Sequence, residues 1–125
     1  MKISILLPYK ENFTKKNAGA VSLFVNQTSK VSKYKKNIIV FGNTLFNDYL
    51  DKSYKNIDFD KKIFRSSSKI FVDNFLQNEN VLDSDIIEIH NRPNYIKSII
   101  KKYDKKIFLY FHNDPLSMDG STTIK

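Results

Sequence analysis

Four largely apolar runs alternate with longer amphipathic stretches along this chain. They cover residues 3–7, 38–41, 85–90 and 106–111, and a proline, glycine or polar residue follows each. Short runs bounded in this way are typical of strands buried on both faces of a sheet. The pattern therefore predicts four buried strands.

Amphipathic helices are predicted between these strands. The apolar residues at helical spacing are, in chain order, Val21, Phe24, Val25 and Val31, then Phe71, Val72, Phe75 and Leu76, and then Ile96, Ile99, Ile100 and Tyr103. Serines at 66–68 offer a cap for the second helix, and Pro93 suits the first turn of the third. The stretch 44–60 is ambiguous: its apolar residues are compatible with a short helix, and a weak strand is predicted near 63–64.

Strands that alternate with helices are typical of βαβ units, whose parallel sheet is covered on both faces. The predicted fold class is α/β, with a Rossmann-like parallel sheet and right-handed connections. A chain of 125 residues has the size of one compact domain. It contains no cysteine, which excludes disulfides and thiolate sites, and no apolar run approaches the ~20 residues that span a bilayer. A cytoplasmic protein is the default expectation.

The net charge of +8 suggests an anionic partner, but its make-up argues against nucleic acid. Lysines account for 19 of the 21 basic residues, whereas forked recognition of phosphate and guanine relies on arginine. Lysine, asparagine and isoleucine are also abundant, and all three have AT-rich codons. The lysines at 33–36 and 101–106 end predicted helices, where cations interact favourably with the helix dipole.

A short internal repeat is the most informative feature of the sequence. Residues 86–93 and 108–115 each consist of a largely apolar strand followed by His-Asn-x-Pro, 22 residues apart. This spacing fits one βαβ unit, so His90 and His112 are predicted at equivalent carboxyl ends of two parallel strands. If the strands are neighbours, they lie ~4.8 Å apart, both imidazoles point to one face, and Glu88 and Tyr110 share that face close enough to interact.

Ligands of open α/β sheets bind at the carboxyl ends of the strands, where helix N-termini also attract anions. The predicted topology gathers polar groups suited to sugars at this edge: Tyr9, Lys10, Lys15, Lys16, Gly19, Asn43, His90, Asn91, Arg92, His112, Asn113 and Asp114. Gly19 would let backbone approach a ligand closely. The three lysines either meet an anionic substrate or belong to a solvated loop.

Some of these residues can instead serve only to begin helices, because helix capping alone favours Asn, Asp and Pro where a strand leads into a helix. We interpret the histidines as functional because two of them stand in register at the ligand edge. A metal site is not predicted, since no third ligand accompanies them and Asp114 is interpreted as a cap. The glycine-rich phosphate motifs and the common hydrolase motifs are absent.

In this order and spacing, the features resemble the N-terminal domain of retaining, family 4 type glycosyltransferases with the GT-B fold. The resemblance rests on the Met-Lys-Ile start, the loop that ends at residues 18–20, and the segments 85–93 and 109–115. It covers essentially the whole chain. It implies a domain that binds mainly the acceptor, with Gly19 and His112 lining the cleft.

The resemblance also implies roles and partners. By the resemblance, His112 would be the catalytic residue and Gly19 would contact substrate. From their place at the ligand edge, the further expected substrate contacts are His90, Asn91, Arg92, Asn113, Asp114, Lys15 and Lys16. No metal or other cofactor is implied. The partners would be a nucleotide-sugar donor and a hydroxyl acceptor, either a glycan or a lipid-linked sugar.

The chain departs from this family in one large respect. Its three glutamates, Glu11, Glu79 and Glu88, form no E-x7-E pair of the kind that binds the nucleotide-sugar in the second domain. Residues 1–125 are therefore expected to be a truncated N-terminal domain, an incomplete half of a GT-B architecture without its C-terminal domain. Such a chain should be inactive alone, because catalysis in a water-poor cleft needs both walls.

The alternative is a non-catalytic basic module that binds an anionic polymer, such as nucleic acid or an acidic glycan. It predicts affinity that falls steeply with salt and depends on Lys10, Lys15 and Lys16. Peripheral contact with anionic lipid at the inner membrane face is compatible with either hypothesis.

Overall fold

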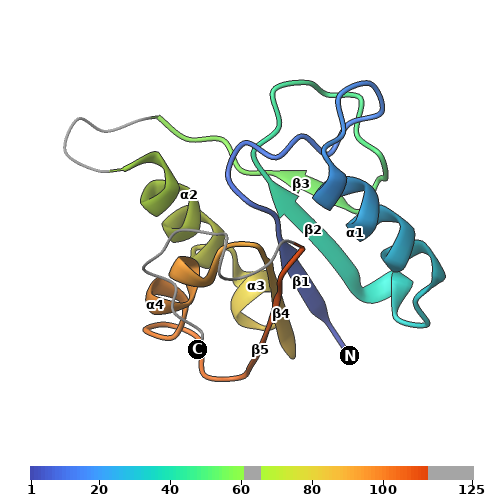
Figure 1. Cartoon of the computed structure of the whole chain (residues 1–125). Coiled ribbons are helices and arrows are strands. Elements are labelled where there is room, and N and C mark those ends of the chain that lie inside the picture. Colours follow the sequence, from blue (N-terminus) through green and yellow to red (C-terminus); the bar gives the residue numbers. More distant parts are fainter. Residues whose placement is uncertain (61–65, 113–125) are drawn as a thin grey trace.

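The computed structural model describes residues 1–60 and 66–112, and it confirms the α/β fold class. In this part of the chain, one fully parallel sheet has the strand order β3-β2-β1-β4-β5 (Figure 1). The strands are Ile3–Leu6 (β1), Ile38–Gly42 (β2), Tyr54–Asn56 (β3), Ile86–His90 (β4) and Lys106–Tyr110 (β5). The strand β3 was not predicted, because three residues are too few to show a period.

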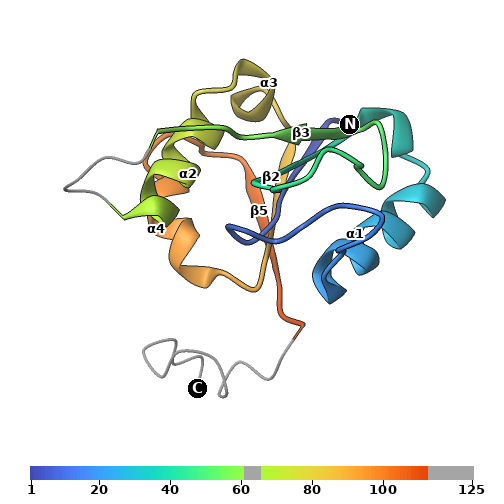
Figure 2. The same cartoon turned by 90° about the horizontal axis from the view of Figure 1, so that it is seen from above.

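Helices lie on both faces of the sheet, which gives the fold its Rossmann-like layers. The helix α1 (Ala20–Val31) covers one face, and α2 (Ser67–Leu76), α3 (Glu79–Leu82) and α4 (Ile96–Ile99) cover the other (Figure 2). Two short 3-10 helices, η1 (Lys35–Asn37) and η2 (Pro93–Tyr95), precede β2 and α4. From β1 to β3 the chain moves across the sheet in one direction, and from β4 to β5 it moves in the other. Because each connection is right-handed, the helices of these two halves lie on opposite faces of the sheet.

The residues that α1 buries differ in part from those predicted from the sequence. Val21 and Val25 are buried against β1 and β2 as expected, but the stripe continues through Ser22 and Asn26. Val31, which was predicted on the apolar face, is 85% exposed. Phe24 is 41% exposed and turns away from this core, towards the end of β5.

The second core lies between the sheet and the other helices. Phe71 and Phe75 of α2 pack there with Ile87 and Ile89 of β4, all of them fully buried. The predicted cap is present, since the Ser66 side chain accepts a hydrogen bond of 3.1 Å from the Lys69 N–H. This core packs β4 against α2 up to Ile89, the residue before His90.

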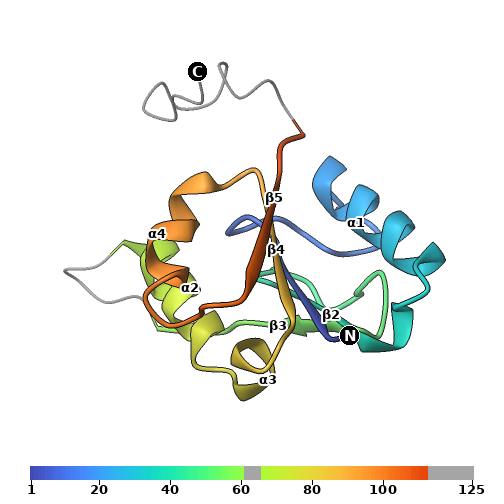
Figure 3. The same cartoon turned by 90° about the horizontal axis from the view of Figure 1, so that it is seen from below.

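Two stretches differ from the sequence-based expectations. The predicted short helix between 45 and 50 is a loop, and an antiparallel bridge joins Thr14 to Tyr49. The weak strand predicted near 63–64 lies outside the described residues. The strand β5 is an edge strand, with Phe108 44% and Tyr110 41% exposed, because α1 leaves the β4–β5 side of its face uncovered (Figure 3).

Candidate functional site

The two histidines of the chain meet at the carboxyl edge of the sheet. His90 is the last residue of β4, and His112 follows the end of β5. His90 Nδ1 and His112 Nε2 are 2.8 Å apart, and the ring centroids are 5.0 Å apart. The end of β5 lies beside the N-terminal end of α1 (Figure 3).

The register of β4 and β5 corrects the interpretation of the repeat. His90 stands opposite Tyr110, so His112 lies two residues beyond the position that the repeat predicted. A shift of two residues keeps the side chain on the same face, which is why the imidazoles still meet. The ring of Tyr110 stacks on His90 at 5.0 Å, and Glu88 stands opposite Phe108.

Asn91 holds the two strand ends together. Its backbone adopts the left-handed conformation, with φ of 56°. Its N–H donates to the Tyr110 carbonyl (2.8 Å), and its side-chain Oδ1 accepts from the N–H of His112 (2.7 Å). The residue is buried. The structure therefore uses Asn91, a predicted substrate contact, to position His112.

His90 and His112 differ in their access to solvent. His90 is only 1% exposed, whereas His112 is half-buried. Burial lowers the pKa of His112 below the usual histidine value, His90 lowers this pKa further, and Glu11 opposes the shift. His112 is therefore a neutral imidazole at neutral pH, able both to donate and to accept a hydrogen bond.

Gly19 makes room for a side chain of this protein. A Cβ at this position would lie 2.8 Å from the carboxyl carbon of Glu11 and nearer still to Oε2. The same Oε2 accepts a hydrogen bond of 3.1 Å from the Ser22 N–H, in the first turn of α1. The close approach predicted for a ligand is thus made by Glu11, which already places an anion at the helix N-terminus.

Aromatic rings border the histidine pair. Phe24 of α1 meets His112 edge-on, with ring centroids 4.8 Å apart. Below the pair, a cavity of about 140 Å³ has Phe24 on one side and Glu88, His90 and Tyr110 on the other. This is roughly the space of one six-membered ring. Apolar rings with a few polar groups among them are typical of small-molecule sites.

Within the described residues, Arg92, Lys15 and Lys16 form no hydrogen bond with the histidine pair. Arg92 donates from Nη1 to the Asn91 carbonyl (2.7 Å). The N–H groups of Lys15 and Lys16 donate to Asp48, which lies in the loop between β2 and β3. These two strands lie towards the edge of the sheet opposite to β5. Asn113 and Asp114 lie outside the described residues.

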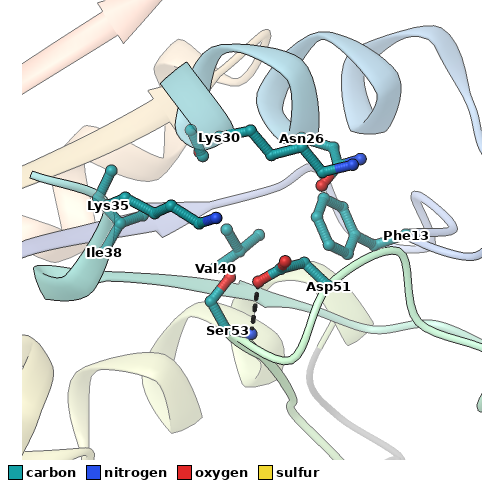
Figure 4. Close-up of a pocket in the computed structure, with 9 residues that line it drawn as sticks. Phe13, Asn26, Lys30, Lys35, Ile38, Val40, Asp51 and Ser53 are labelled. Carbon is teal, nitrogen blue, oxygen red and sulfur yellow. Dashed lines mark hydrogen bonds between the residues drawn. The ribbon is translucent and has the colours of Figure 1, made fainter. Parts of the chain in front are cut away.

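The lysines near the amino ends of β2 and β3 form a second polar region. Lys30 and Lys35 lie on either side of Asp51 around a cavity of about 10 Å³, too small for more than one water (Figure 4). Hydrogen bonds from Ser53, and the charges of Lys35 and Lys30, hold the pKa of Asp51 below its usual value. An ionised carboxylate thus already occupies the place an anionic ligand would take between these lysines.

The described part of the chain contains neither a three-residue metal-ligand cluster nor a helix that could span a membrane. Residues 1–60 and 66–112 contain no cluster of three histidine, cysteine, aspartate or glutamate side chains able to hold a metal ion. None of the helices in these ranges has the length and apolar character needed to cross a bilayer.

Comparisons with known proteins give no family. No family model, curated protein or solved structure matches the chain. The candidate site therefore rests on its own geometry.

Two members of the candidate site were missed from the sequence. Glu11 carries no local signal, because only the folded loop brings it to α1. Phe24 was predicted on the buried face of its helix. In the structure the buried face instead includes Ser22 and Asn26, and Phe24 points away from it.

Proposed function

We propose that this chain is the acceptor-binding part of a GT-B glycosyltransferase. The enzyme would transfer a sugar from a nucleotide-diphosphate donor to a hydroxyl group of a glycan or lipid-linked acceptor. The proposal includes a cytoplasmic location, with peripheral contact at the inner membrane face where the acceptor is lipid-linked.

One observation carries the proposal: a neutral, half-buried imidazole lies beside aromatic side chains at the carboxyl edge of a parallel sheet. His112 can exchange hydrogen bonds with hydroxyl groups, the ring of Phe24 lies beside it, and the ring of Tyr110 stacks on the adjacent His90. Sugars present hydroxyl groups and apolar C–H faces together, so this combination suits them.

The carboxylate of Glu11 supports an acceptor in preference to a phosphate at this point. It occupies the N-terminus of α1, which in many α/β proteins binds the phosphates of a ligand. A second anion would be repelled there. In the proposed enzyme, the nucleotide-sugar is held mainly by a second domain, as the resemblance implies, and residues 1–125 alone should bind weakly and transfer nothing.

Binding of neutral sugars to the whole chain tests this proposal. A ¹⁵N-labelled sample titrated with a panel of neutral disaccharides should show shifts at His112, Phe24 and Tyr110. His112→Ala should weaken binding about fivefold, the effect of one lost hydrogen bond of ~1 kcal/mol. Phe46→Ala removes an exposed ring in the loop between β2 and β3. It is the matched control and should leave affinity unchanged.

A second candidate, a basic module for an anionic polymer, is favoured by the lysines near β2 and β3. Lys35, Lys36, Lys52 and Lys55 line one shallow depression, with Asp51 as the acidic residue among them. With a heparin hexasaccharide in the same titration, this function predicts shifts at these lysines and a steep loss of affinity with salt. Such a result, together with no response to neutral disaccharides, would contradict the glycosyltransferase proposal.

A further inference from the structure

Three titratable side chains form a continuous chain at the candidate site. Glu88 Oε2 lies 3.4 Å from His90 Nε2, and His90 Nδ1 lies 2.8 Å from His112 Nε2. The side chain of His90 is 2% exposed and that of Glu88 is 19% exposed. Glu88 also borders the cavity beneath the pair, so the chain runs from that cavity to His112.

Packing does not explain these polar residues. In the neighbouring segment of β1, Ile5 stands opposite Glu88, and Leu7, two residues further along on the same face, is also buried and apolar. A buried carboxylate–imidazole pair loses hydration that an apolar pair would not lose. Residues 88 and 90 therefore have a role beyond filling this face.

The hydrogen-bond inventory indicates where the protons of this chain lie. A carboxylate only accepts, so the His90 nitrogen that faces Glu88, Nε2, carries a proton. With one proton on each ring, His90 Nδ1 accepts from Nε2 of His112. Among the described residues, none then donates to the lone pair on His112 Nδ1.

We propose that Glu88 and His90 are positioning residues that hold His112 in its Nε2–H tautomer, so that His112 Nδ1 accepts a hydrogen bond from a hydroxyl group of the sugar acceptor. The inference rests on the proposed function for the identity of that hydroxyl. The proposed tautomer rests on the contacts of Glu88, His90 and His112 and not on the identity of the ligand.

The surroundings of His112 keep this acceptor available at neutral pH. Phe24 of α1 places its ring against His112 and Tyr110 of β5 against His90. Among the described residues, the carboxyl groups that face the pair are Glu88 from β4 and Glu11 from the loop before α1. Burial and the adjacent His90 outweigh Glu11, so the pKa of His112 lies below its usual value. The lone pair on Nδ1 is consequently unprotonated.

Long-range ¹H–¹⁵N spectra of the imidazoles test the proposal directly, using the whole chain at pH 7.5. In the wild type, Nε2 of both histidines should carry the proton, and both Nδ1 atoms should show the ¹⁵N shift of an unprotonated nitrogen. Glu88→Leu keeps bulk on an apolar face, and it should let both histidines sample both tautomers, so that the two ¹⁵N shifts of each ring approach each other. Glu88→Gln retains an acceptor oxygen and should restore the wild-type pattern.

Glu79→Ala removes an exposed glutamate of α3 and is the matched control, expected to leave the imidazole signals unchanged. A wild-type His112 protonated on Nδ1, or unchanged tautomers in a folded Glu88→Leu variant, would overturn the proposal. The wild-type spectrum alone decides the first point, even if the variant does not fold. If the tautomers are as proposed but no sugar binds, the positioning role stands and the glycosyltransferase proposal fails.

Discussion

Gly19 and Glu11 illustrate how one residue can be required by another far from it in sequence. The φ of Gly19 is −77°, which any residue adopts, so glycine is needed there for space and not for conformation. That space is taken by the Glu11 carboxylate, which caps α1 through the Ser22 N–H. From the sequence, the same glycine was interpreted as an opening for a ligand, because nothing local marks Glu11 as its neighbour.

A double-mutant cycle on this pair gives a prediction at the residue scale. Gly19→Ala displaces the Glu11 carboxylate and removes the cap, a loss of ~1 kcal/mol. In a Glu11→Ala background there is no cap to lose, so the same substitution should cost less by about 1 kcal/mol. Urea unfolding of the four proteins measures this coupling, and additive effects would show that Glu11 does not cap the helix.

At the scale of elements, the pattern of apolar runs predicted the strands that are long enough to show a period. It located β1, β2, β4 and β5 to within one or two residues. It missed β3 and α3, whose three and four residues show no pattern of their own. It also could not show that β5 lies at an edge, because strand order depends on contacts between distant segments. For the same reason, it aligned the two histidines two residues out of register.

Asn91 provides a prediction for the end of β4. Asn91→Gly loses the hydrogen bond from the His112 N–H but adopts the left-handed conformation without strain. Asn91→Ala loses the same hydrogen bond and is also strained in that conformation. Alanine should therefore be less stable than glycine by about 1 kcal/mol, the usual penalty of that conformation for a residue with a Cβ. Thermal or urea unfolding of both variants checks the order. Equal stabilities would contradict the structural role of this backbone conformation.

The whole molecule combines a Rossmann-like scaffold with a row of three polar side chains, Glu88, His90 and His112, on one face of the sheet. The parallel sheet and its two helical layers follow from alternating strands and helices, and the sequence was sufficient for this. The candidate site was only partly predictable. The two histidines were found from a repeat, whereas the Glu88–His90–His112 contacts and the Glu11 cap arise from the packing of three separate segments.

The lowered pKa of His112 makes the stability of the whole molecule depend on pH. Its contribution is complete above the unfolded value of about 6.5. As the pH falls below this, the unfolded chain takes up a proton that the folded His112 resists, so stability declines until the pH passes the lowered folded pKa. The free energy of unfolding should thus fall between pH 7.5 and 5, and less steeply in His112→Asn. Identical pH profiles would contradict the assignment.

The central claim is that a sugar binds against His112 at the carboxyl edge of the sheet. Isotope-filtered nuclear Overhauser spectra of the labelled chain, with a disaccharide that binds it, test this claim most directly. We predict contacts from the C–H protons of the sugar to the rings of His112, Phe24 and Tyr110. Contacts to Lys35, Lys36, Lys52 and Lys55 in their place, with none to His112, would contradict the account.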